Sequence, residues 1–176
     1  TTVDISKRDI TNGKELPGAK LEIRDADGNL VEGWTSGKVP HTVRGLELEK
    51  EYTLTEKRAP DGYAEAESIV FKLVQEGTEQ VNEVYVKSDD DWVKLDDATV
   101  IMQDAPVLDI DKTDIAGNLL PGATLTIRDV SDEVVDTWTT DYKTHRIPIS
   151  DDFLKLSNDS KEYIYTLTED AAPAGF

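Results

Sequence analysis

The sequence has no cysteine, and only two histidines and one methionine among its 176 residues. Without cysteine the chain can form no disulfide and can offer no thiolate to a metal ion. The two histidines, His41 and His145, are too few for a histidine-rich metal site. We therefore expect neither a metal nor a cofactor, and any covalent cross-link must use other chemistry.

Positive charge is also scarce, because 19 lysines and arginines stand against 37 acidic residues, for a net charge of −18. A strongly acidic protein repels phosphate backbones and anionic membrane surfaces, so we expect no nucleic-acid partner and no membrane contact. No apolar run approaches the roughly 20 residues of a membrane span. No segment resembles a signal peptide or an anchor, so the sequence would be an excerpt if its parent protein is exported.

An internal repeat organises the chain. Residues 7–19 (KRDITNGKELPGA) recur as residues 112–123 (KTDIAGNLLPGA), and residues 52–63 (YTLTEKRAPDGY) recur as 165–176 (YTLTEDAAPAGF). The second copy has an insertion between these motifs, which we place in the polar segment Ser157–Lys161. The repeat predicts two modules, a complete one at residues 1–106 and a C-terminally incomplete one at residues 107–176.

Short alternating segments separated by glycine, asparagine, aspartate and proline predict an all-β fold. LEIR and LVEGW on either side of Asp27-Gly28 indicate a hairpin, and IVFKLV and EVYVK are further strand candidates. Several short strands per module of about 100 residues are typical of a Greek-key β-sandwich. Asp25–Asn29 resembles the start of a calcium loop, but its twelfth position is Ser36 instead of glutamate, which favours a turn.

Strand alternation places three ionisable side chains on apolar faces, because successive side chains point to opposite sides of a strand. They are Lys7 in VDISK, Glu56 in YTLTE and Asp104 in TVIMQD, although the apolar Ile101 on the opposite side of TVIMQD leaves the face of Asp104 ambiguous. The second copy repeats the pattern with Lys112 and Glu169, which share faces with Leu108, Ile110, Tyr165 and Leu167. Buried charges cost several kcal/mol unless they are paired or neutralised. A buried Lys7–Glu56 salt bridge is one explanation, and alternation alone does not exclude it.

At these residues the sequence resembles the collagen-adhesin B-type (CnaB, prealbumin-like) domains of Gram-positive pilins and adhesins. ISKRDITNGKELPGAKLEIRDADGN is similar to the fibronectin-binding-protein domain from which the SpyCatcher/SpyTag pair was made. YTLTEKRAPDGY matches the family's E-box, L-x-E-x-x-A-P-x-G-Y, and VIMQDAP matches the last strand, which carries the acceptor. The resemblance implies tandem Ig-like, prealbumin-like sandwich modules.

The resemblance also implies a self-formed isopeptide bond in the first module. Lys7 matches the nucleophile, Glu56 the catalytic acid and Asp104 the acceptor, so water would be released. Lys112 and Glu169 match the nucleophile and catalyst of the second module, whose acceptor lies outside this chain. The bond forms once per molecule, so we do not expect an enzyme with an external substrate.

By this resemblance the chain is a structural stalk or pilin module on the cell-wall-anchored, extracellular surface of a Gram-positive bacterium. Its partners would be neighbouring modules of the same surface protein. Two alternatives stay open at this stage. One is an adhesin module whose loops bind a host matrix protein, and the other is a hydrolase that uses Glu56 and Asp104 as paired carboxylates.

Overall fold

The computed structural model describes residues 1–75, 77–78, 82–149, 153 and 164–176. The chain divides into two compact units, Thr1–Pro106 and Val107–Phe176, and each is described by itself. The inserted segment predicted at residues 157–161 lies outside the described residues.

The described residues of the first unit form nine strands. They are β1 (Thr2–Asp9), β2 (Lys20–Asp25), β3 (Leu30–Thr35), β4 (His41–Arg44), β5 (Tyr52–Arg58), β6 (Ile69–Gln75), β7 (Asn82–Ser88), β8 (Asp91–Lys94) and β9 (Thr99–Asp104). The predicted strands correspond to β1, β2, β3, β5, β6, β7 and β9, whereas β4 and β8 were not predicted. Both of these are only four residues long, which is too short for a clear alternation.

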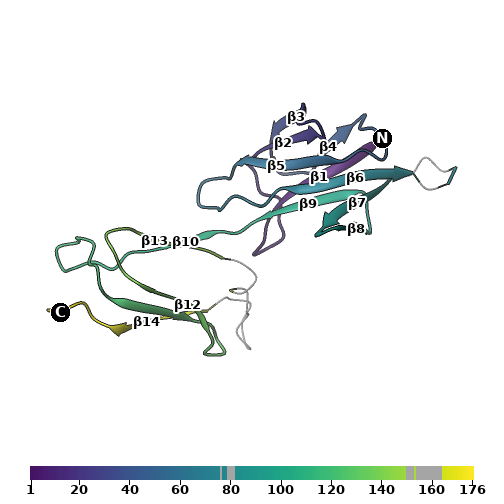
Figure 1. The fold of residues 1–176 in the computed structure, drawn as a ribbon. Helices are drawn as coiled ribbons and strands as arrows, with labels where there is room; N and C mark the ends of the chain where they lie inside the picture. The colour runs from purple at the N-terminus through teal and green to yellow at the C-terminus, as the bar shows by residue number, and fades with distance from the viewer. Residues whose placement is uncertain (76, 79–81, 150–152, 154–163) are drawn as a thin grey trace. The chain divides into compact units, whose positions relative to one another are not determined.

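Two sheets build the first unit, one with the order β4-β1-β9 and one with the order β3-β2-β5-β6-β7-β8 (Figure 1). Apolar side chains from both sheets pack into one core, among them Ile5, Met102, Leu54 and Phe71, which are almost completely buried. The predicted all-β sandwich class is therefore confirmed. Burial of this alternating apolar face is the main force that holds the two sheets together.

Strand β1 lies between β4 and β9, antiparallel to the first and parallel to the second. In the parallel pair Lys7 lies opposite Met102, and Asp9 lies opposite Asp104. Parallel neighbours need a long crossover connection, and here the rest of the unit supplies it. The first and the last strand of the unit therefore run side by side.

The β2–β3 connection is the predicted hairpin turn and not a calcium loop. The Asp25 carboxylate accepts hydrogen bonds from the backbone N–H of Asp27 (3.0 Å) and of Asn29 (2.8 Å). Gly28 has a φ of 83°, a conformation that glycine adopts without steric cost. The carboxylate that would have been a metal ligand is thus used to hold the turn.

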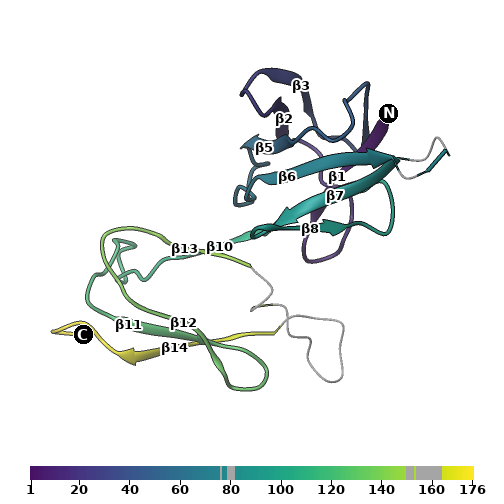
Figure 2. The same cartoon turned by 45° about the vertical axis from the view of Figure 1, so that its right-hand side comes forward.

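The second unit has two sheets among its described residues, β10-β13 and β12-β11-β14 (Figure 2). The strands are β10 (Val107–Ile110), β11 (Thr124–Arg128), β12 (Val134–Thr139), β13 (His145–Pro148) and β14 (Thr166–Ala171). Ile127, Ile147 and Phe153 form its buried cluster. This core is smaller than that of the first unit, so a larger share of its strand residues remains exposed.

The Pro-Gly turn of each unit is held by one side-chain hydroxyl. The Ser36 hydroxyl accepts a hydrogen bond from the Ala19 N–H (2.9 Å) and donates one to the Leu16 carbonyl (2.7 Å). In the second unit the Thr140 hydroxyl makes the corresponding pair of bonds, at 2.9 and 2.7 Å. The two copies therefore share this contact although the residue differs.

We expect Ser36→Ala to destabilise the first unit by about 1–3 kcal/mol, because it leaves a buried N–H and a buried carbonyl without their partner. Ser36→Thr restores the hydroxyl that the second unit uses and should cost much less. Guanidinium unfolding of both variants measures the difference. Equal destabilisation by the two substitutions would show that the hydroxyl is not what holds the turn.

Candidate functional site

Lys7 is one of the most deeply buried side chains of the protein, with only 1% of its surface exposed. It follows Val3 and Ile5 on the same face of β1, and this face packs into the core. The alternation that buries the two apolar residues buries the lysine as well. The inward orientation predicted for Lys7 is confirmed.

Glu56 and Asp104 reach the same point from different sheets. Glu56 lies on β5 and Asp104 at the end of β9, and their side chains have no exposed surface. Ile101, whose apolar character made the orientation of β9 ambiguous, is 41% exposed and points away from the core. The structure therefore brings together all three side chains that the first module was predicted to use.

The Lys7 ammonium contacts both carboxyl groups. Its Nζ lies 3.2 Å from Glu56 Oε1 and within hydrogen-bonding contact of Asp104 Oδ1. The second Glu56 oxygen, Oε2, accepts a hydrogen bond from the Ala66 N–H at 2.8 Å. Lys7 thus sits between two carboxyl groups, one of which is anchored to the backbone that follows β5.

Two buried carboxyl oxygens, Glu56 Oε1 and Asp104 Oδ2, accept no hydrogen bond from the described residues. Lys7 Nζ forms an ion pair with Glu56 Oε1, but the two atoms do not have the geometry of a hydrogen bond. Unsatisfied buried acceptors are costly. A single proton held between the two carboxyl groups would satisfy both oxygens, so the arrangement favours one neutral carboxylic acid.

Burial raises the pKa of Asp104 from its ordinary value of 3.8 to about 6. The positive charge and hydrogen bond of Lys7 oppose this rise, and the neighbouring Glu56 adds to it. Desolvation therefore outweighs the attraction of the lysine. Asp104 keeps its proton over a pH range in which an exposed aspartate is ionised.

Asp9 extends this site, and the sequence analysis gave it no role. It follows Lys7 by two residues on the same face of β1, and it is 7% exposed. Its carboxylate accepts a hydrogen bond from the Tyr63 hydroxyl at 2.7 Å. The same alternation that located Lys7 would have placed Asp9 inward, but no motif marked Tyr63 as its partner.

In the second unit Lys112 and Glu169 also meet, with 3.2 Å between Nζ and Oε2. The prediction that they are buried is wrong, because their side chains are 29% and 34% exposed. Their apolar neighbours Leu108 and Leu167 are 36% and 50% exposed. Strand β10 pairs only with β13 among the described residues, so no strand takes the place that β9 has beside β1.

Each histidine has a structural role. The His41 ring stacks on Trp34 with 4.4 Å between the ring centroids and contacts Glu32 at 2.6 Å. His145 stacks on Trp138 at 4.0 Å in the second unit. Trp34 and Trp138 pack against the apolar clusters of their units.

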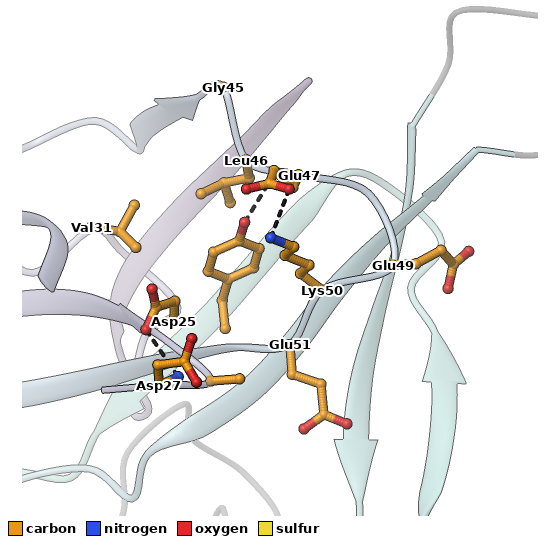
Figure 3. A pocket seen from close by; sticks show the side chains of 11 residues that line it. Asp25, Asp27, Val31, Gly45, Leu46, Glu47, Glu49, Lys50 and Glu51 are labelled. Carbon is orange, nitrogen blue, oxygen red and sulfur yellow. Dashed lines mark hydrogen bonds and ion pairs between the residues drawn. The ribbon is translucent and has the colours of Figure 1, made fainter. Parts of the chain in front are cut away.

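An acidic groove of about 510 Å³ lies at the β4–β5 connection (Figure 3). Asp25 is engaged in its own turn, and Glu47 pairs with Lys50 at 2.7 Å. The side chains of Glu49 and Glu51 extend outward and do not converge (Figure 3). Among the described residues no group of three histidine or acidic side chains could hold a metal ion.

Two sheets that share one apolar core form the β-sandwich of the first unit. The model of the SpaA prealbumin-like fold domain matches residues 1–88, half of the sequence, and the chain belongs to this family. A search of curated proteins gave no match. In the described part of the chain, no helix is long and apolar enough to cross a membrane.

Several solved structures resemble the chain. The Bacillus anthracis TIE protein is 25% identical over 98% of this chain and 29% of its own length, with a TM-score of 0.40. The pilus-presented adhesin Spy0125 (Cpa) is 22% identical over 73% of this chain and 32% of its own, with a TM-score of 0.43. The shaft pilin SpaA from Lactobacillus rhamnosus GG is 12% identical over 76% of this chain and 62% of its own, with a TM-score of 0.38. The chain thus spans about a third of the first two.

Proposed function

We propose that the first unit is a structural module of a Gram-positive surface protein, stabilised by an isopeptide bond between Lys7 and Asp104. The observation that carries the proposal is the convergence of Lys7, Glu56 and Asp104 in an otherwise apolar core. A salt bridge would need one carboxylate, whereas this cluster holds two. A hydrolase would need substrate access, and both carboxyl side chains are completely covered.

The reaction is a condensation. The neutral Lys7 amine attacks Cγ of the protonated Asp104 carboxyl, so that an N–C bond forms and a C–O bond breaks. A proton from the amine leaves with the departing hydroxyl as water. Glu56 relays this proton and polarises the carbonyl through a hydrogen bond, the part that a general acid–base residue plays.

The fold promotes this chemistry in two ways. Burial disfavours the charged forms of amine and carboxyl, so the reactive neutral pair becomes accessible. Folding also holds the two groups in contact, and such proximity can remove about 7–11 kcal/mol of a barrier. The product amide is neutral, which removes the cost of keeping Lys7 and Asp104 charged in the core.

The position of the bond suits a load-bearing stalk. It would connect the first strand, β1, to the last, β9, across 97 positions of the chain. Tension entering at Thr1 would pass along β1 to Lys7, cross to Asp104 and leave at the end of the unit. The intervening strands would carry none of this tension. A chain without cysteine would thereby gain a covalent cross-link.

Within the SpaA prealbumin-like family, we place the chain with the CnaB-type domains and its first unit near the domain behind SpyCatcher. The motifs at Lys7, Glu56 and Asp104 support this placement. The second unit would be a further module of this type, with Lys112 and Glu169 in the corresponding roles. Neighbouring modules would be the partners, at the cell-wall-anchored surface.

The intact mass of the folded protein tests the proposal. We expect the mass to be lower than that of the sequence by one water molecule. Glu56→Ala and Glu56→Gln should restore the full mass, because both remove the acid that relays the proton. Glu67→Ala changes an exposed glutamate of the β5–β6 connection and should leave the water loss intact. A full, unmodified mass for the unaltered protein would overturn the proposed bond.

A further inference from the structure

The segment at residues 59–66, which connects β5 towards β6, contacts several parts of the buried cluster. The Tyr63 hydroxyl donates a hydrogen bond to Asp9 Oδ2 at 2.7 Å. The Ala64 N–H donates to the Ala105 carbonyl at 3.0 Å, directly after Asp104. Further along, the Ala66 N–H holds Glu56 Oε2 at 2.8 Å. One short segment therefore touches the ends of β1 and β9 and the catalytic carboxyl group.

Asp9 ties this segment to the acceptor strand. It lies opposite Asp104 in the parallel β1–β9 pair, and the next N–H, that of Ile10, donates to the Asp104 carbonyl at 3.0 Å. The other Asp9 oxygen accepts hydrogen bonds from the Thr11 N–H (2.7 Å) and hydroxyl (2.6 Å). The two carboxylate oxygens thus have separate partners, Tyr63 for one and the local turn at Thr11 for the other.

The protonation states of Asp9 and Tyr63 suit the hydrogen bond between them. Burial pushes the pKa of Asp9 upward, but the hydrogen bonds from Thr11 and Tyr63 outweigh it and lower the pKa overall. The hydrogen bond to Asp9, with burial, raises the pKa of Tyr63 to about 12. Asp9 is therefore an ionised acceptor and Tyr63 a protonated donor across the neutral pH range.

We propose that Tyr63 is a positioning residue for the Lys7–Asp104 bond, because its hydrogen bond to Asp9 holds the 59–66 segment against the end of β9. This inference rests on the proposed function and adds a residue to it. The segment, once fixed, sets the orientation of the Glu56 carboxyl through Ala66 and the position of Asp104 through Ala105. Tyr63 itself transfers no proton.

The second copy of the repeat lacks the residue that donates this hydrogen bond. Phe176 stands where the first copy has Tyr63, and it has no hydroxyl to donate. Asp114, which corresponds to Asp9, accepts hydrogen bonds from the N–H groups of Ala116 and Asn118 in its own turn, both at 2.9 Å. The comparison shows that the aspartate alone folds the turn, so the contact to Tyr63 serves something further.

The test follows cross-link formation in the full chain after cell-free synthesis, by intact mass at successive times. We expect Tyr63→Phe to slow the loss of water about tenfold, because a small misplacement of reacting groups has a large effect on rate. Thr11→Val removes a different hydroxyl from the same Asp9 carboxylate and should leave the rate within about twofold of the original protein. The pH profile of the rate should keep its shape in Tyr63→Phe.

Asp9→Ala should slow the reaction as much as Tyr63→Phe, and the double variant should be no slower than either one. Stability is measured separately in the Glu56→Gln background, where no bond forms. An unchanged rate in Tyr63→Phe, with only stability reduced, would overturn the positioning role, and so would a changed pH profile. If the original protein loses no water, the proposed bond itself fails, which is a distinct result.

Discussion

Asp104→Ala should lower the free energy of unfolding of the first unit by about 4–5 kcal/mol. The proposed Lys7–Asp104 bond would close a loop of 97 positions, and a cross-link across about 100 residues restricts the unfolded chain by roughly 4.7 kcal/mol. Lys7 keeps Glu56 as a partner in this variant, so no unpaired buried cation is added to the loss. The effect is therefore mainly that of the missing bond.

Hydrogen exchange of peptides from β5 and β6 reports on the first unit within the intact chain. These strands contribute completely buried residues such as Leu54 and Phe71, so their amides exchange by global unfolding of the unit. Gln103→Ala is the matched control, since it changes an exposed neighbour on the same strand. A loss in Asp104→Ala no larger than that of the control would be incompatible with a covalent link.

Asp104→Asn tests whether a side-chain amide can replace the carboxylic acid as the acceptor. An asparagine acceptor would release ammonia instead of water, and the product amide would be identical to that of the original protein. We therefore expect the variant to reach the same final mass and the same stability. A stable, unlinked Asp104→Asn protein would show that the carboxylic acid is required.

The second large expected effect is a pH dependence of the free energy of unfolding. In a protein that cannot form the bond, such as Glu56→Gln, stability should fall as the pH rises from about 4 towards 6, by less than about 3 kcal/mol, because Glu56 no longer adds to the rise of the Asp104 pKa. Burial raises the pKa of Asp104 to about 6 in the folded state, against an ordinary value of 3.8. Between these values the folded protein binds more protons than the unfolded chain, so raising the pH favours unfolding. Above pH 6 this dependence ends.

Two comparisons isolate the contribution of Asp104 to the pH dependence of stability. In the original protein the proposed amide would include Asp104 and remove its titration, so its share of the pH dependence should vanish. In the double variant Glu56→Gln, Asp104→Asn the titrating group is absent, and the slope should vanish as well. Chemical unfolding between pH 4 and pH 7 measures all three proteins. A slope that persists in the double variant would assign the pH dependence to other groups.

Local sequence order was sufficient for most strands of the first unit and for the lysine and glutamate of its site. Alternation along β1 and β5 predicted that Lys7 and Glu56 point inward and left Asp104 on β9 ambiguous, and the structure buries all three. This worked because a side chain's face is fixed by its position in the strand. The turn at Gly28 followed from local chemistry in the same way.

The same alternation was misleading in the second unit. Lys112 and Glu169 have the same local pattern as Lys7 and Glu56, yet they remain partly exposed. A strand's alternation determines which side chains share a face, but a second layer must cover that face to bury it. In the first unit β9 and the strands β6 to β8 provide this cover, and the described residues of the second unit have no counterpart.

Composition and residue order were enough to predict the all-β class, the repeat, the absence of thiol chemistry and the inward orientation of Lys7 and Glu56. Each of these depends on composition or on order along one strand. The packing of the whole unit was needed to find that β1 and β9 are parallel neighbours and that Tyr63 binds Asp9 across 54 positions. It also decided which of the two lysine–glutamate pairs is buried. Burial and long-range hydrogen bonds depend on which strands pack together, and that information is not local to any motif.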